Sequence, residues 1–261
     1  NDPVPALLDA IGTHPDPEPT APPSKATSRV VMIVLDGVGE RAILPLAERG
    51  ALGPLAAIIP VDTGVPSLSR PGYHVSLTGV PQRVSGIRAN FFATARADSV
   101  VDRVHAAGGT VAFLQEGVPW YGELFAKPGD FVSSAPWAGG TATFARARET
   151  GAALIVVHLT GADNAGHGSG AASEAYRWTI DRQIEAIAAL VQQVEGTSGA
   201  DETRWLVGAD HGHTPAGGHG GPEADVTEVS WFLLARGHDR DVSTHRVLTR
   251  RSATTIAPLV A

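Results

Sequence analysis

The chain has 261 residues, of which 43% are hydrophobic and 18% charged, a composition typical of one large globular domain or two small ones. The formal net charge of −7 argues against nucleic acid as a stable partner, because binding along a phosphate backbone requires a basic face. The sequence contains no cysteine, so any transition-metal site must use histidine and carboxylate ligands. No apolar run reaches the roughly 18 to 20 residues of a transmembrane segment.

The first 28 residues are predicted to form an arm outside the main domain. Residues 13–25 are dense in proline and acidic residues, which is typical of an extended linker. Leu7, Leu8 and Ile11 could form a short docked helix before it. The chain begins at Asn1 without a methionine, which indicates a trimmed N-terminus and leaves a cytoplasmic or an exported location open. We expect one domain over residues 29–261, without a large cap domain.

From residue 30 onward, apolar runs alternate with amphipathic segments. The apolar runs predict buried strands at residues 30–35, 110–114, 153–157, 205–207 and 231–235. Helical periodicity predicts helices at residues 42–49, 100–107, 141–150 and 171–194. This alternation indicates an α/β fold in which a mostly parallel sheet lies between helical layers. In such folds, ligands bind at the carboxyl ends of the strands.

Six carboxylate and imidazole side chains follow the predicted strands or lie in glycine-rich turns. They are Asp36, Asp163, His167, Asp210, His211 and His219. Singly, each has an ordinary explanation, since an aspartate after a strand usually caps a helix or forms a turn, and a histidine in a glycine-rich loop is usually solvated. Together, three carboxylates and three imidazoles would meet at one edge of the sheet, where such ligands bind divalent metal ions. The sequence therefore predicts a metal site there.

The order of these motifs resembles the alkaline phosphatase superfamily, and most closely its type I phosphodiesterase/nucleotide pyrophosphatase branch. In that branch a nucleophile segment similar to T-F-P-N-H precedes a T-G pair, an H-G-I motif and an asparagine. The matching positions here are residues 69–73, Thr78-Gly79, residues 85–87 and Asn90, and later Tyr176 and Asp181. The resemblance extends from about residue 30 to the segment at residues 252–261.

This resemblance implies a three-layer α/β/α fold and a metal-dependent phosphoric ester hydrolase with two divalent ions, zinc being expected and manganese the alternative. The implied ligands are Asp163, His167 and His219 for one ion, and Asp36, Asp210, His211 and the Ser69 oxygen for the other. Ser69 would be the nucleophile and form a covalent phospho-serine intermediate. Asn90 and the backbone N–H after Ser69 would bind a phosphoryl oxygen. The substrate would be a small-molecule phosphate ester; a phosphonate hydrolase and a non-catalytic metal-binding relative are the alternatives.

Two positions depart from the branch pattern. Ser67 is a competing nucleophile, although the distance to Thr78-Gly79 favours Ser69. Arg70 stands where nucleotide pyrophosphatases tend to have an aromatic residue. Because arginine binds phosphate in a bidentate manner, Arg70 could favour a monoester dianion or a charged leaving group, or it could simply point to solvent.

Three other protein classes are disfavoured. A sulfatase is disfavoured because the arginine of the C/S-x-P-x-R segment and any cysteine are missing, and a mutase because only residues 212–218 separate His211 from His219. No G-x-G-x-x-G motif follows the first predicted strand, which argues against a Rossmann-type nucleotide-binding protein.

Three further histidines and three aromatic residues remain as secondary candidates. His158 is expected to orient a ligand carboxylate, His213 to lie near the substrate or in a loop, and His74 to be structural. Residues 117–140 are predicted to be irregular. There Trp120 and Tyr121, with Trp137 nearby, are predicted to contact the leaving group of the substrate, or alternatively to pack a small lid. The sequence leaves the oligomeric state open.

Overall fold

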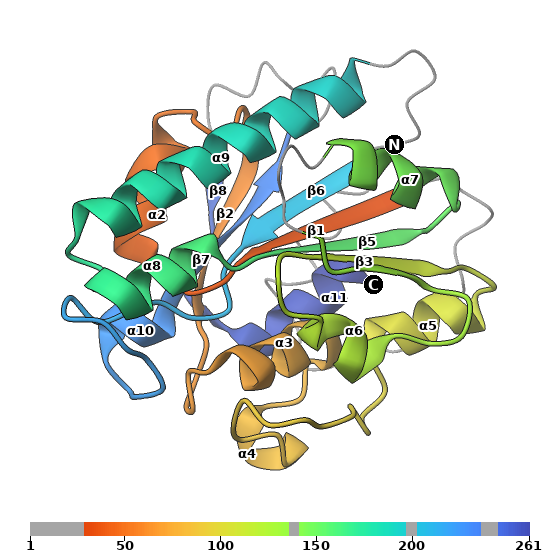
Figure 1. The fold of residues 1–261 in the computed structure, drawn as a ribbon, viewed down its shortest axis with the longest axis horizontal. Helices are drawn as coiled ribbons and strands as arrows, with labels where there is room; N and C mark the ends of the chain where they lie inside the picture. The colour runs from red at the N-terminus through yellow and green to blue at the C-terminus, as the bar shows by residue number, and fades with distance from the viewer. Residues whose placement is uncertain (1–28, 136–140, 197–202, 236–244) are drawn as a thin grey trace.

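The computed structural model describes residues 29–135, 141–196, 203–235 and 245–261, and Figure 1 shows their fold. The predicted N-terminal arm and Trp137 lie outside these residues. A single sheet runs through the described part in the order β4-β3-β5-β1-β6-β7-β2-β8, and β9 also pairs with β2. The strands are β1 (Arg29–Leu35), β2 (Leu55–Asp62), β3 (Val111–Gln115), β4 (Phe131–Ser133), β5 (Leu154–Leu159), β6 (Thr203–Gly208), β7 (Glu228–Leu234), β8 (Arg246–Val247) and β9 (Arg251–Ser252).

The centre of the sheet is parallel, as predicted. β1 pairs in parallel with both β5 and β6, and its last residue, Leu35, lies opposite Leu159 of β5. The five predicted strands are present as β1, β3, β5, β6 and β7. Only β7 departs from the parallel arrangement among these, since it runs antiparallel to β6 and to β2. The register brings the segments that follow β1, β5 and β6 to one edge.

Strand β2 was not predicted, and its proline explains why. Pro60 lacks a backbone N–H and is therefore unusual inside a sheet. In this sheet β8 pairs with Ala57 and Ile58 of β2, and β9 pairs with Val61 and Asp62. Pro60 falls in the gap between these two short strands, so its missing donor interrupts no ladder on that side.

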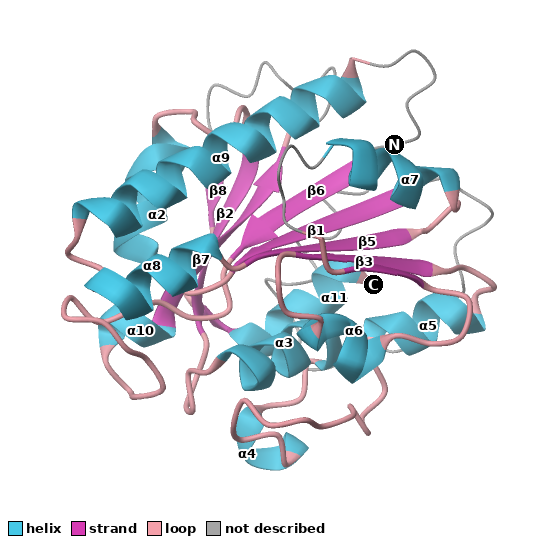
Figure 2. Cartoon of the chain, in the orientation of Figure 1, coloured by secondary structure: helices cyan, strands magenta, loops and turns pink. Residues whose placement is uncertain are grey.

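Helices cover both faces of the sheet (Figure 2). One face carries α2 (Glu40–Glu48), α7 (Thr141–Glu149), α8 (Gly161–Ser169) and α9 (Glu174–Glu195), and the other carries α3 (Ser69–Thr78), α5 (Val100–Ala106), α6 (Trp120–Phe125) and α11 (Ile256–Val260). Short α4 (Gln82–Ser85), α10 (Ala224–Thr227) and the 3-10 helix η2 (Ala253–Thr255) complete the described elements. The predicted apolar stripe of α9 is buried: Ile180, Ile184, Ile187, Leu190 and Val191. This three-layer arrangement confirms the predicted fold class.

The prediction of an irregular segment at residues 117–140 is wrong for its described part, which contains α6 and β4. The side chain of Gln115 makes this possible, because its Oε1 accepts hydrogen bonds from the backbone N–H groups of Tyr121 (2.7 Å) and Gly122 (3.1 Å). These are donors that the first turn of a helix leaves unpaired. Among the described residues, none of the helices combines the length and apolar character of a membrane span.

Gly208, the last residue of β6, is required by the packing of the sheet edge. A Cβ atom there would overlap the ring of Trp231 in β7, which is 1% exposed and has no room to move. We expect Gly208→Ala to lower the free energy of unfolding by about 1–3 kcal/mol, as for other overpacked cores. Urea denaturation would measure this. Gly168→Ala is the matched control, because no heavy atom lies within 4 Å of its Cβ position; an equal loss in both variants would contradict the packing argument.

Candidate active site

The predicted ligands converge at the carboxyl edge of the three central parallel strands. Asp36 follows β1 directly, α8 with Asp163 and His167 follows β5, and Asp210 and His211 follow β6. His219 comes from the loop between β6 and α10. The strand register places all these segments side by side, so residues more than 170 positions apart meet, as the 3.3 Å hydrogen bond from Gly37 N–H to Asp210 Oδ1 shows.

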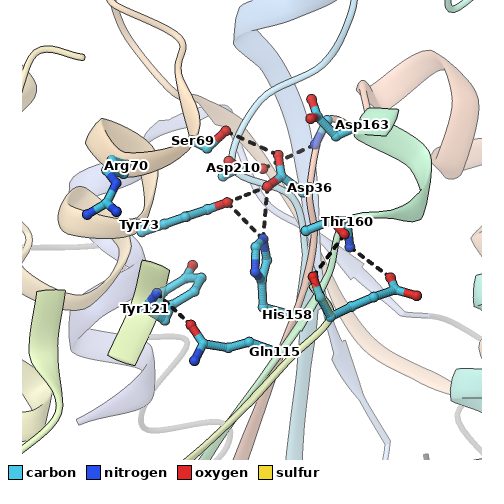
Figure 3. A network of polar contacts seen from close by, with 12 residues as sticks. Asp36, Ser69, Arg70, Tyr73, Gln115, Tyr121, His158, Thr160, Asp163 and Asp210 are labelled. Carbon is cyan, nitrogen blue, oxygen red and sulfur yellow. Dashed lines mark hydrogen bonds and ion pairs between the residues drawn. The ribbon is translucent and has the colours of Figure 1, made fainter. Parts of the chain in front are cut away.

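Asp36, Asp210 and His211 form the first group that could hold a metal ion. Their ligand atoms all lie within 4.8 Å of one another, and all three side chains are buried. Ser69 Oγ lies beside them, 3.4 Å from Asp36 Oδ1 (Figure 3). The same oxygen is 3.2 Å from His211 Nε2. Asp210 Oδ2 is buried without a hydrogen-bond partner among the described residues. It lies 3.4 Å from His211 Nε2. A buried carboxylate oxygen without a hydrogen bond is costly, and a cation would satisfy it, so the donor set fits a divalent ion.

The electrostatics of this group also favour a cation. Burial and the neighbouring Asp36 charge raise the pKa of Asp210 well above its ordinary value. Burial lowers the pKa of His211, but the carboxylates of Asp210 and Asp36 outweigh it and raise that pKa to about 10. For Asp36, burial is outweighed by His158 and His211, which hold its pKa well below the ordinary value. The pKa shifts of Asp210 and His211 both show that this group concentrates negative charge in the interior, which a cation would balance.

Asp163, His211, His213 and His219 form a second group whose ligand atoms lie within 4.8 Å of one another. His167, predicted as a ligand here, lies next to this group: its Nε2 is 3.6 Å from Asp163 Oδ2 and 3.1 Å from His219 Nε2. Burial and the nearby His211 lower the pKa of His219 to about 4, which leaves its imidazole neutral and able to bind a metal. The two groups share His211, so two ions bound in them would be neighbours.

The segment that carries Asp163 and His167 is helix α8, not the glycine-rich turn expected from the sequence. Glycine disfavours helix, but the Glu116 carboxylate accepts hydrogen bonds from the backbone N–H groups of Thr160 (3.0 Å) and Gly161 (3.2 Å) and satisfies the start of this helix. Residues i and i+4 of a helix lie on one face. Asp163 and His167 therefore point toward the same site.

His213 occupies a slot lined by glycines. Its Nε2 lies 2.8 Å from Asp163 Oδ1, and the side chain is fully buried. A Cβ atom at Gly166 would overlap the His213 ring, and one at Gly37 would lie 2.9 Å from its Cδ2. Both glycines are thus required by the placement of this imidazole. Of the two roles left open for His213, the structure supports one inside the site rather than a solvated loop position.

Helix α3 begins at Ser69, so the hydroxyl stands at a helix N-terminus, where free N–H groups and the helix dipole favour an anion. The backbone N–H of Arg70 donates to Asn90 Oδ1 (3.0 Å), which brings Asn90 to this site. Ser67, the competing candidate, is turned elsewhere: its hydroxyl donates to the Gly221 carbonyl (2.7 Å) and accepts from Gly220 N–H (3.1 Å). Ser67 thereby holds the loop of His219, whose Nδ1 is 3.0 Å from the Ser67 carbonyl.

Arg70 does not point to solvent. It is 3% exposed, pairs with Glu123 through Nη2, and lies 5.0 Å above the centroid of the Trp120 ring. Its Nε and Nη1 are buried and have no hydrogen-bond partner within the described part of the chain. These unpaired donors are what an anion-binding arginine would offer.

Tyr121 is placed differently from its predicted role at the leaving group. Its side chain is fully buried and stacks on Tyr73 with 4.2 Å between ring centroids, so the packing alternative applies to it. Trp120 is half-buried. The sequence also gave no reason to select Phe91 and Phe92, which directly follow Asn90 and are 79% and 76% exposed. The exposed aromatic surface beside the site therefore lies on the segment after Asn90.

Two buried side chains contact Asp36 from behind. His158 Nε2 lies 2.9 Å from Asp36 Oδ2, a contact that would orient a ligand carboxylate as expected from the sequence. The Tyr73 hydroxyl, which sequence reasoning missed, hydrogen-bonds to the same oxygen. The available signal was its position in the nucleophile motif, where the resembling branch has a histidine. His74 is buried near Phe125 with 6.3 Å between ring centroids and points away from this network, as a structural residue would.

The fold is shared with several solved structures. Murine ectonucleotide pyrophosphatase/phosphodiesterase 5 superposes with a TM-score of 0.71 at 11% identity, over 89% of this chain and 94% of that one. TAB5 alkaline phosphatase gives a TM-score of 0.55 at 13% identity over 89% and 96% of the two chains. For phosphonoacetate hydrolase from Sinorhizobium meliloti the TM-score is 0.50 at 17% identity, over 72% and 57%. No curated protein matches the chain in sequence.

A family model matches part of the chain in sequence. The model of type I phosphodiesterase/nucleotide pyrophosphatase matches residues 140–234, the part of the chain that carries Asp163, His167, Asp210, His211 and His219. Over these residues the chain is similar to that family, and its fold is the one shared with the alkaline phosphatase-like structures above. The predicted resemblance to this family is thus confirmed over residues 140–234, and it supports the class of a phosphoric ester hydrolase. In this chain the carboxyl edge of the sheet carries the candidate ligands.

Proposed function

We propose that this protein is a metal-dependent hydrolase of phosphate esters that acts through a covalent intermediate on Ser69. The observation that supports this most directly is the position of the Ser69 hydroxyl, 3.4 Å from Asp36 Oδ1 and 3.2 Å from His211 Nε2 at the start of α3. A hydroxyl in that position would be next to a bound cation and at the positive end of a helix. Both would stabilise the negative charge on the attacking oxygen and on the phosphoryl group in the transition state.

Two divalent ions, zinc by preference, would be held by the two groups of side chains. Asp36, Asp210, His211 and Ser69 Oγ would bind one, and Asp163, His167 and His219, with His213 beside them, the other. When bound, these ions would stabilise the attacking and leaving oxygens and make the Ser69 hydroxyl easier to deprotonate. Two features of the chain suit this role: Asp210 Oδ2, which is buried without a hydrogen bond, and the neutral His219.

The reaction would proceed in two displacements at phosphorus. Ser69 Oγ forms a bond to phosphorus and loses its proton to water, while the bond from phosphorus to the leaving-group oxygen breaks and that oxygen takes up a proton. Water then attacks the phospho-serine, releasing phosphate or a phosphate monoester and restoring the hydroxyl. The Asn90 amide NH₂, whose Oδ1 already accepts from Arg70 N–H, would bind a phosphoryl oxygen in both steps.

The proposal covers both phosphodiesters and phosphomonoesters. Among the relatives in fold, an inactive variant of murine ectonucleotide pyrophosphatase/phosphodiesterase 5 has been solved in complex with AMP, with a TM-score of 0.72 to this chain at 11% identity. That ligand carries a phosphate ester and an aromatic base. A panel of an aryl phosphate, an aryl phosphodiester, a nucleotide pyrophosphate and a phosphonate, with zinc or manganese added, tests the proposal. Hydrolysis of none of them, with less than one ion bound per chain, would favour a non-catalytic relative.

Arg70 is the residue that we expect to separate monoesters from diesters. A monoester dianion has one more negative oxygen for the unpaired Nε and Nη1 of Arg70. Arg70→Ala should therefore lower kcat/KM about 10-fold or more for the aryl phosphate, and less for the diester, as expected for loss of a charge-assisted hydrogen bond. Arg96→Ala, at an exposed position on the segment after Asn90, is the control. Equal losses for both esters would mean that Arg70 supports the site through Glu123 without selecting the substrate.

A further inference from the structure

The two carboxylate oxygens of Asp36 face different surroundings. Oδ1 faces the proposed metal and nucleophile, 3.2 Å from His211 Nε2 and 3.4 Å from Ser69 Oγ. Oδ2 faces the interior, where it accepts hydrogen bonds from the Tyr73 hydroxyl and from His158 Nε2. Figure 3 shows the three side chains meeting behind the site. One oxygen is thus available to a metal ion, and the other is already occupied by the protein.

Tyr73 and His158 also contact each other. The Tyr73 hydroxyl oxygen lies 2.8 Å from His158 Nε2, so a single N–H on Nε2 can be shared between this oxygen and Asp36 Oδ2, while the Tyr73 O–H donates to Asp36. Asp36 is 2% exposed, and Tyr73 and His158 are both fully buried. Because water does not reach these groups, each lost contact would leave a buried polar atom unpaired.

The surrounding packing holds this pair in place. Tyr73 stacks on Tyr121 of α6 with 24° between the ring planes, and His158 meets Tyr73 edge-on with centroids 4.8 Å apart. The backbone of His158 lies in β5 opposite Val34 of β1, two residues before Asp36. The two groups that contact this carboxylate oxygen are therefore held by a helix, α3, and a strand, β5, and not by loops.

We infer that Tyr73 and His158 are positioning residues that hold Asp36 so that it binds the metal through Oδ1 alone. Binding through both oxygens would require Oδ2 to give up two buried hydrogen bonds, for which the interior offers no replacement. The inference rests on the proposed metal site. Outer contacts of this kind contribute about 10- to 100-fold to metal affinity in other metalloproteins.

The test is zinc affinity, measured on the full chain by competition with a chelator. Tyr73→Phe keeps the ring that stacks on Tyr121 and removes only the hydroxyl. We expect the dissociation constant of the zinc ion bound by Asp36 to rise by about 10- to 100-fold. Tyr121→Phe is the matched control, since it also removes a buried hydroxyl on the same stack, one that lies 3.4 Å from Ser76 Oγ and does not contact Asp36. Equal affinities for these two variants would overturn the inference.

His158 provides a second, independent arm if Tyr73→Phe does not fold. Gln at position 158 keeps a donor for Asp36 Oδ2 and Leu does not, so we expect zinc affinity in the order wild type, His158→Gln, His158→Leu. The visible absorption of bound cobalt should change in the same order, because it reports ligand geometry and not turnover. If wild type binds zinc and all variants match it, only this inference fails. If wild type binds neither zinc nor manganese, the proposed function fails as well.

Discussion

Ser69→Ala is expected to lower kcat/KM for an aryl phosphate or phosphodiester by about 10⁴-fold or more, a loss typical of removing an enzymatic nucleophile. The reason is chemical, since alanine has no oxygen to bond to phosphorus. The fold should survive, because Ser69 contacts Asp36 and His211 through a single weakly held hydroxyl. Steady-state assays with zinc present would measure the loss, and mass spectrometry after acid quenching should find a phosphoryl group on wild type but not on the variant.

Ser67→Ala is the control for this substitution, because Ser67 is two residues away and equally buried. It loses two hydrogen bonds to the loop at Gly220 and Gly221, so we expect a stability loss of about 1–2 kcal/mol. Its backbone carbonyl still contacts His219, and its activity should fall by less than about 10-fold. Full activity in Ser69→Ala, or a phosphoryl group on Ser67, would contradict the nucleophile assignment.

Removal of metal is expected to abolish activity and to make stability more sensitive to pH. In the metal-free chain the pKa of His211 is raised to about 10, above the ordinary value of 6.5. Its folded state therefore holds a proton that the unfolded state releases, so this stabilisation is complete below pH 6.5 and is lost as pH rises toward 10. A bound cation displaces that proton, and its stabilising effect should grow over the same range.

Thermal denaturation at several pH values, with chelator or with zinc, would measure this. We expect the melting temperature of the chelated protein to fall as pH rises above 6.5, and the difference between the two preparations to widen. Titration calorimetry in buffers of different ionisation enthalpy should show proton release on zinc binding near neutral pH. A pH-independent difference, or zinc binding without proton release, would contradict the assigned charge state of His211.

The central strands and the residues that follow them were predictable from the sequence because they depend on local patterns. Apolar runs such as β1 and β5 are buried on both faces, so hydropathy alone identifies them. The rule that parallel strands deliver ligands at their carboxyl ends then places Asp36, Asp210 and His211 together. β2 escaped this reasoning because Pro60 is compatible with a strand only in the gap between β8 and β9, which is a tertiary feature.

By itself, the sequence determined the layer architecture, the resemblance to type I phosphodiesterases and the identity of the residues gathered at the sheet edge. Only the tertiary structure decided which of these residues touch. It made a helix of the glycine-rich segment through Glu116, buried Tyr121, placed His213 between two glycines and set Tyr73 and His158 behind Asp36. The two contacts to Asp36 alone join residues that are 37 and 122 positions apart. No periodicity or local propensity encodes such pairs, because their energies arise only when the sheet and its helices pack around them.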